Sequence, residues 1–299
     1  MKTNRKEFIT YLAIAFGISW GLQFIAVGFQ GTLVYQILAM VMMYAPFVAV
    51  WIAKRGLRHE KSGVEWGLKL KKNWKWIVAA WFLPAVLTIM GGILYYLVFP
   101  DKFDAGCGYA RELYAGTGML DADGNIQGMP IQTLIIIQAV SGVFYAPLMN
   151  MFFALGEEVG WRGYMTPVLI EWMGKKKALI VSGVIWALWH APLIVLTGYE
   201  YGTGYVGEPF LGVAMMCVFA TSAGILLSFL YEKTNSIWVP SIAHGAINAI
   251  CAIPIMFMNE IPEHYLLGPT SAGLLSGLPI WILAGVVFVK MICVTNKKY

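Results

Sequence analysis

The stretch Gly156-Glu157-Glu158-Val159-Gly160-Trp161-Arg162 places two carboxylates and a guanidinium where an apolar run ends. An acidic residue at the centre of a membrane helix costs about 2.5 to 3.5 kcal/mol on insertion scales, so a charged cluster beside a span is a candidate functional site. The same residues also fit the ordinary end of a membrane helix, where two glutamates end the helix and an arginine lies at the cytoplasmic interface. The stretch alone leaves both interpretations open.

The composition around this stretch indicates an integral membrane protein. Of the 299 residues, 59% are hydrophobic and 12% are charged, with a mean hydropathy of +0.68, whereas soluble domains carry about 25% charged residues. The net charge of +5 comes from basic residues in short segments beside apolar runs, so we expect no nucleic-acid partner. No CxxC pair and no cysteine metal site is formed by Cys107, Cys217, Cys251 and Cys293.

Eight apolar runs are long enough to cross a bilayer as helices of about 20 residues each. They predict an all-α, polytopic membrane helix bundle of about eight transmembrane helices, with residues 1–299 as a single transmembrane domain. The first run is longer than the core of a secretory signal peptide, so we expect an uncleaved helix. The expected spans are residues 8–29, 33–53, 76–99, 131–155, 178–197, 209–231, 237–258 and 273–294.

The basic residues predict the orientation of these spans. With the amino terminus inside, 19 of the 21 lysine and arginine residues fall on or near one side, and only Lys102 and Arg111 fall on the other. We therefore expect an integral protein, of the plasma membrane, with both termini cytoplasmic. Residues 100–130 form an external loop. The basic residues 54–75 predict an interfacial anchor for the third span, with a docking surface for anionic lipid as the alternative.

Residues 163–173, which follow the opening stretch, are too short to span, and we expect an interfacial or re-entrant helix there. Within the stretch, residues four apart share a helix face, so Glu158 and Arg162 are expected partners. Glu157 points toward a different neighbour and is free to act as a base.

Two later spans also carry polar side chains. The fifth contains His190, one turn after Trp186, and the seventh contains His244 and Asn248 on one helix face. Taken singly, each fits an interhelical hydrogen bond as well as it fits a catalytic role. Together with Glu157 they predict a site where three helices converge, open toward the cytoplasm, with His244 and Asn248 as a candidate oxyanion hole.

In their order along the chain, these residues resemble the three signatures of the CPBP intramembrane proteases. This family includes the type II CAAX prenyl endopeptidases and the bacteriocin-processing or immunity (ABI) proteins. The second signature commonly begins with phenylalanine, where this chain has tryptophan. The motifs, which all lie within residues 157–248, are Glu157-Glu158-xxx-Arg162, Trp186-xxx-His190 and His244-xxx-Asn248.

The resemblance implies an endopeptidase in which Glu157, with His190, activates a water molecule that attacks a scissile carbonyl. His244 and Asn248 would stabilise the resulting oxyanion, with support from the pair Glu158 and Arg162. The implied substrate is a membrane-associated peptide or lipidated protein, of the prenylated CAAX type or a bacteriocin or signal peptide.

Three alternatives remain open at this point. We expect no required cofactor, but Glu157, His190 and His244 have the residue types of a zinc site, although no HExxH motif is present. A non-enzymatic transporter, immunity or scaffold protein would use the same polar cluster for ions or partners. The oligomeric state is undetermined, because Gly17-xxx-Gly21 and Gly156-xxx-Gly160 permit close packing within one chain or between two.

Overall fold

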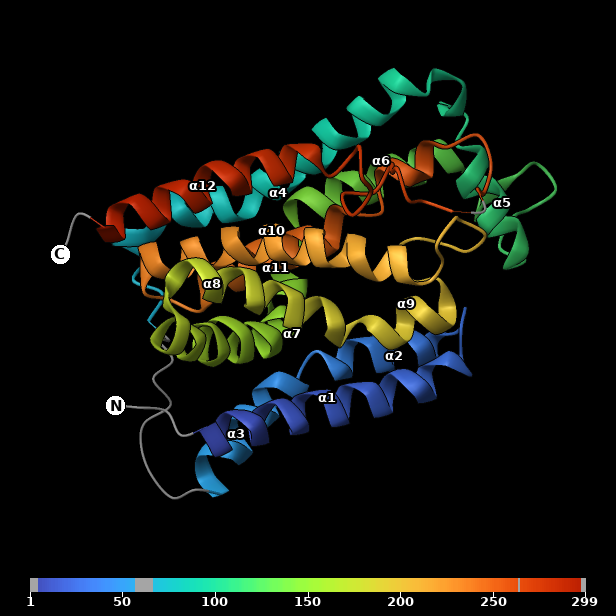
Figure 1. The fold of residues 1–299 in the computed structure, drawn as a ribbon. Helices are drawn as coiled ribbons and strands as arrows, with labels where there is room; N and C mark the ends of the chain where they lie inside the picture. The colour runs from blue at the N-terminus through green and yellow to red at the C-terminus, as the bar shows by residue number, and fades with distance from the viewer. Residues whose placement is uncertain (1–4, 57–66, 263, 297–299) are drawn as a thin grey trace.

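The structure is a computed structural model that describes residues 5–56, 67–262 and 264–296. Within these residues the chain folds into a bundle of α-helices (Figure 1), which confirms the predicted all-α membrane fold class. The α-helices are α1 (Arg5–Val27), α2 (Leu33–Met42), α3 (Ala45–Gly56), α4 (Leu70–Val98), α5 (Gly108–Gly116), α6 (Ile131–Phe144), α7 (Ala146–Gly160), α8 (Thr166–Trp189), α9 (Ala191–Thr197), α10 (Phe210–Thr234), α11 (Trp238–Ile250) and α12 (Leu278–Asn296).

Shorter elements join these helices. A π-helical turn, η2, continues α7 toward α8, and an antiparallel pair of two-residue strands precedes α6. The remaining elements are η1 (Pro100–Lys102), β1 (Asn125–Ile126), β2 (Met129–Pro130), η2 (Trp161–Met165) and η3 (Pro254–Phe257).

Helix occupies each of the eight expected spans, although several spans are broken. By length and composition, five helices of the described chain are able to cross a membrane, or six if one bent pair is a single span. The pair is bent by 57° between α6 and the helices that follow it, and α12 offers only a shorter apolar segment, Leu278–Cys293. The sequence therefore located the apolar segments but not their bends.

A short helix follows the opening stretch, as the sequence predicts, while its interfacial or re-entrant position stays a prediction. A short helical segment follows Arg162, and α8 is then interrupted at Gly174, whose φ of 76° and ψ of 157° are not helical. Glycine adopts a positive φ without the Cβ penalty of other residues. The first part of α8 is therefore distinct from the part that carries Trp186 and leads to His190.

Glycines let α7 pack closely on both of its neighbours. A Cβ at Gly160 would lie 2.3 Å from Cβ of Pro46 in α3, and one at Gly245 of α11 would lie 2.5 Å from the backbone nitrogen of Met151 in α7. The Gly156-xxx-Gly160 pattern thus packs within this chain. Because Gly245 follows His244, the close α7–α11 contact brings that histidine to the acidic end of α7.

The two ends of the bundle are formed by different elements. The start of α1 and the end of α12 lie at the same end, whereas α5 and the β pair lie at the other (Figure 1). No sequence periodicity predicted α5, which contributes Ala110 to a small core with Ile131 and Ile135. The predictions for the basic positions Lys2, Arg58, Lys61, Lys297 and Lys298 fall outside the described residues, as do residues 57–66 of the expected inner loop.

Candidate active site

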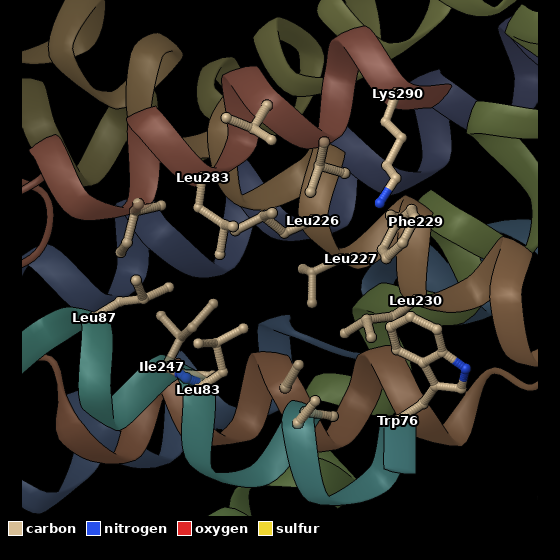
Figure 2. A pocket seen from close by; sticks show the side chains of 17 residues that line it. Trp76, Leu83, Leu87, Leu226, Leu227, Phe229, Leu230, Ile247, Leu283 and Lys290 are labelled. Atoms are coloured by element: carbon tan, nitrogen blue, oxygen red, sulfur yellow. The ribbon is translucent and has the colours of Figure 1, made fainter. Parts of the chain in front are cut away.

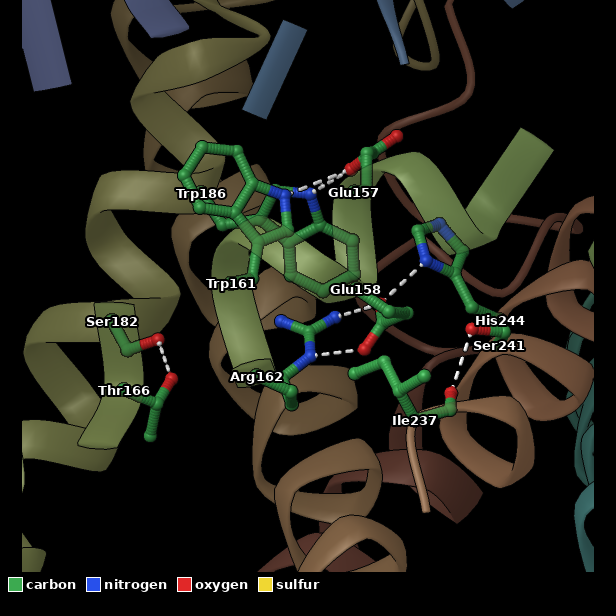
Figure 3. Close-up of polar contacts among 10 residues, drawn as sticks. All are labelled: Glu157, Glu158, Trp161, Arg162, Thr166, Ser182, Trp186, Ile237, Ser241 and His244. Carbon is green, nitrogen blue, oxygen red and sulfur yellow. Dashed lines mark hydrogen bonds and ion pairs between the residues drawn. The ribbon is translucent and has the colours of Figure 1, made fainter. Parts of the chain in front are cut away.

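Glu158 is the centre of a buried ionic cluster (Figure 3). Its two carboxylate oxygens accept hydrogen bonds from Nε and Nη2 of Arg162, one turn later on the same helical path. Nδ1 of His244, on α11, lies 2.7 Å from Oε1 of Glu158. The side chains of Arg162, Glu158 and His244 are 1%, 0% and 5% exposed. The structure thus contains the expected Glu158–Arg162 pair and adds a histidine 86 residues away.

Glu157 has different partners from its neighbour. Its Oε2 accepts hydrogen bonds from the indole nitrogens of Trp161, at 3.0 Å, and Trp186, at 2.7 Å. Figure 3 shows that the other carboxylate oxygen points away from these indoles. The side chain is buried, at 2% exposure. The two indoles therefore orient Glu157 and leave Oε1 as its available oxygen.

Trp161 was not among the predicted site residues, although its position carried a signal. It lies four residues after Glu157, the same spacing that predicted the pair Glu158 and Arg162. Side chains at this spacing meet on a helix, and an indole N–H is a hydrogen-bond donor. The rule that paired the charges would therefore also have paired this tryptophan with Glu157.

Trp186 connects the two carboxylate environments. While its N–H binds Glu157, its ring faces the guanidinium of Arg162, whose Cζ lies 4.5 Å from the ring centroid. The same ring packs at 5.2 Å from His244 and 6.2 Å from His190, between centroids. Cation–π contacts gain strength when they are desolvated, as this one is. Replacing the usual phenylalanine with tryptophan therefore adds a donor to Glu157 and keeps an aromatic face.

His190 stands at the break between α8 and α9. Its Nδ1 lies 3.0 Å from the backbone carbonyl oxygen of Trp186. A carbonyl only accepts hydrogen bonds, so Nδ1 carries the proton and Nε2 of the neutral ring is an acceptor. The ring lies between Trp189, at 4.8 Å and nearly perpendicular, and Tyr199, at 6.2 Å and parallel. The hydrogen bond to Trp186 thus leaves Nε2 of the neutral ring as the acceptor, and the two aromatic contacts hold the ring in place.

A cavity of about 130 Å³ brings most of the predicted residues together. Trp186, His190, His244 and Asn248 all line it. Asn248 is exposed, and its side chain lies on the same helical face as His244. Glu157 does not line the cavity and is joined to it through the indole of Trp186.

Tyr199 and Glu200 also line this cavity and were missed by the sequence analysis. Burial raises the pKa of the Glu200 carboxyl above its ordinary value, and a hydrogen bond with Tyr199 opposes this shift. These residues follow α9, at the end of the bundle away from the start of α1 (Figure 1). The cavity wall therefore includes residues at the end of the bundle away from the start of α1, and the predicted opening toward the cytoplasm stays a prediction.

The zinc alternative requires Glu157, His190 and His244 around one ion. Across the described ranges, no three histidine, cysteine or acidic side chains form a group that could hold a metal. Nδ1 of His244 is bound to Glu158, and Oε2 of Glu157 is bound to two indoles, so any ligand would meet the other nitrogen and the other oxygen of these side chains. The zinc alternative stays a prediction, and we derive no catalytic step from a metal.

Comparison with known proteins agrees with the motifs. Residues 138–250 match the family model described as type II CAAX prenyl endopeptidase Rce1-like. The chain is also similar to CAAX prenyl protease 2 of Methanococcus maripaludis, with 48% identity over 99 residues that cover 31% of this chain and 34% of the relative. The matched segment therefore spans about a third of that relative. Both findings confirm the resemblance, and residues 138–250 contain every predicted site residue.

Proposed function

We propose that this chain is an intramembrane endopeptidase that hydrolyses a peptide bond of a membrane-associated substrate. The match of residues 138–250 to an endopeptidase family supports this function. The observation that carries it is the shared cavity, where His190, His244 and Asn248 meet around Trp186, the hydrogen-bond donor to Glu157. In the described part of the chain, no observation favours the transporter or scaffold alternative.

In the proposed reaction, Glu157 and His190 activate a water molecule. The free oxygen of Glu157 and the unprotonated Nε2 of His190 are the acceptors for the water proton. The water oxygen then bonds to the scissile carbonyl carbon, and the carbonyl oxygen takes up the negative charge. When the C–N bond breaks, the proton held by the base passes to the leaving amine.

His244 and Asn248 are the proposed donors to the oxyanion. The amide of Asn248 donates without any change of charge. The Nδ1 of His244 faces the carboxylate of Glu158, so this nitrogen carries a proton, and Nε2 donates only when the ring is an imidazolium. Glu158 stabilises that cation, while Arg162 balances the remaining carboxylate charge. We propose that His244 acts as the imidazolium in this step, because a charged donor stabilises an oxyanion more strongly than a neutral group.

The proposed substrate is a peptide or a lipidated protein, with prenylated CAAX-type proteins as the first class to test. The relative is named a CAAX prenyl protease, which supports this order. We further propose that the protein lies in the plasma membrane with both termini cytoplasmic. The bias of lysine and arginine along the chain supports this orientation.

The test of the function is the Glu157→Gln variant in lipid nanodiscs. The probes are a farnesylated CAAX peptide with a fluorophore and quencher across the expected cleavage site, and the same peptide without the lipid. Loss of the proposed base should lower cleavage by about 10² to 10⁴-fold. The exposed Glu171→Gln is the matched control and should cleave at the wild-type rate.

Size-exclusion profiles and helix content by circular dichroism establish that both variants are folded. Wild-type activity in Glu157→Gln would contradict the mechanism. No product from either peptide with folded wild-type protein would favour the non-enzymatic alternative. Metal analysis of an active preparation decides the zinc question, because a metal-free active protein needs no zinc.

A further inference from the structure

An apolar groove of about 350 Å³ lies on a different face of α11 from the active-site cavity (Figure 2). Ala243 and Ile247 line the groove, whereas the residues that follow each of them, His244 and Asn248, line the cavity. Helices α4 and α12 form two facing walls, and α10 completes the lining. Ile247 lines both spaces, so an occupant of the groove contacts the helix that carries the proposed oxyanion donors.

The length of the groove matches one leaflet of a bilayer. Along α12 the lining runs from Ile280 to Lys290, which is about 15 Å at 1.5 Å per residue. The hydrocarbon core of a bilayer is about 30 Å thick, so one leaflet is about 15 Å. Beyond the groove, a Cβ at Gly91 of α4 would lie 1.9 Å from the carbonyl oxygen of Ser276. The two walls therefore meet at that end, and the groove is one leaflet deep.

The other end of the groove is basic. Lys290 is its one charged lining residue, and Figure 2 shows the amino group at one end of the lining, near Phe229. A second cavity of about 160 Å³ shares Lys290 and Phe229 with the groove and adds Lys175, Lys233 and Glu232. The groove therefore continues into a space lined by three lysines and one glutamate.

The charges in this space leave a net positive end. Lys175 is ion-paired with Glu232, and Nζ of Lys233 lies 5.4 Å from the ring centroid of Phe229. Lys290 is exposed and makes no ion pair with another described residue. Among the described residues, Lys233 and Lys290 thus form no ion pair with a carboxylate, which favours an anionic ligand.

We propose that the groove and its basic end bind one anionic phospholipid of the surrounding leaflet. One acyl chain lies along the groove, and the phosphate binds Lys290 and Lys233. The length, the apolar lining and the position of the charge each match one part of such a lipid. Apart from Ile247, no residue that lines the groove also lines the active-site cavity, so a ligand of the groove need not reach a scissile bond. The proposal does not depend on the peptidase activity.

The preference for an anionic headgroup is tested with purified protein in detergent. Native mass spectrometry and thermal unfolding compare phosphatidylglycerol with phosphatidylcholine of the same acyl chains. We expect phosphatidylglycerol to bind more tightly and to raise the unfolding temperature more. A basic residue near an anionic lipid contributes about fivefold in affinity, so Lys290→Gln should weaken phosphatidylglycerol binding by about that factor. Lys176→Gln, in the same basic segment but outside the lining, is the matched control.

The proposal that an acyl chain lies in the groove is tested by filling the groove with a larger side chain. Ala79 of α4 lines it, and Val78 is an exposed neighbour that does not. Ala79→Trp should abolish lipid retention, and Val78→Trp should retain it, with both proteins folded by circular dichroism. Retention in folded Ala79→Trp, or equal binding of the two lipids, would overturn the proposal. Displacement of the lipid by the farnesylated peptide but not by its unlipidated form would overturn the choice of phospholipid as occupant.

Discussion

The active-site cavity and the apolar groove are both lined by α10 and α11, but their side chains differ in chemistry. Around the cavity, His244 and Asn248 of α11 meet polar side chains from other helices, whereas Ala243 and Ile247 face a groove lined by hydrocarbon up to Lys290. Both pairs have the spacing that places two side chains on one helical face. Helical periodicity alone is therefore enough to present two chemically different surfaces from one short segment.

The difference also shows what each surface requires of the fold. The groove is stabilised by the burial of apolar area, and this effect does not depend on the direction of a contact. A buried polar group in a membrane needs a specific partner, because an unpaired one costs several kcal/mol. Glu157, Glu158 and His244 all have such partners, and those of Glu158 and Glu157 come partly from other helices. The cavity therefore depends on helix positions far more than the groove does.

The largest loss of stability on the cavity side of the molecule is expected from Arg162→Met. The variant leaves Glu158 buried with only His244 as a partner, and breaking a buried ion pair from one side costs about 3 to 5 kcal/mol of unfolding free energy. Equilibrium unfolding in detergent measures the loss. The double variant Glu158→Gln/Arg162→Met removes both charges and should recover more than half of it. Wild-type stability in the single variant would show that the ionic cluster does not hold the cavity side together.

A smaller effect on stability, but a large one on activity, is expected from Asn248→Ala. Removal of an oxyanion donor lowers kcat by about 10² to 10³-fold. Asn248 is exposed, so the protein should stay folded. The matched change on the groove face is Ile247→Leu, which conserves volume and should leave kcat within a few-fold of wild type. An unchanged kcat in Asn248→Ala would remove this residue from the proposed reaction.

Trp186→Phe tests the indole N–H donor apart from the aromatic ring, because phenylalanine keeps a ring and has no N–H. Phenylalanine keeps a ring near Arg162 and His244 but cannot donate to Glu157, which keeps only the bond from Trp161. A hydrogen bond to a charged group contributes about 1.5 to 3 kcal/mol, so we expect peptide cleavage to fall by at least about tenfold. Trp161→Phe removes the other donor and shows which indole matters more. Full activity in both variants would mean that Glu157 needs no indole to be oriented.

The smallest effect is expected from Glu200→Gln. Burial raises the pKa of this carboxyl above the ordinary value of 4.5, so its contribution to stability is complete below pH 4.5 and is lost as the pH rises through the folded pKa. Unfolding temperatures from pH 4.5 upward should therefore fall less steeply in Glu200→Gln than in the wild type. Glu171→Gln should keep the wild-type slope. Identical slopes in all three proteins would show that burial does not raise the pKa of Glu200 in the folded protein.

Much of the site was accessible from local spacing. The Glu158–Arg162 pair and the shared face of His244 and Asn248 both follow from the four-residue repeat of a helix, and Trp161 could have been found in the same way. The fold class followed from apolar composition and span length. The bend between α6 and α7 was missed, although Pro147 in the first turn of α7 is typical of the start of a new helix.

By itself, then, the sequence determined which segments enter the membrane and which side chains share a helix face, because both depend on residues a few positions apart. Only the tertiary structure decided that Glu158 binds His244, that Trp186 donates to the same oxygen of Glu157 as Trp161 does, and that Glu200 reaches the cavity. These contacts depend on the rotation and depth of one helix against another. Close approaches such as that of Gly245 to α7 set them, and they involve residues that no local pattern connects.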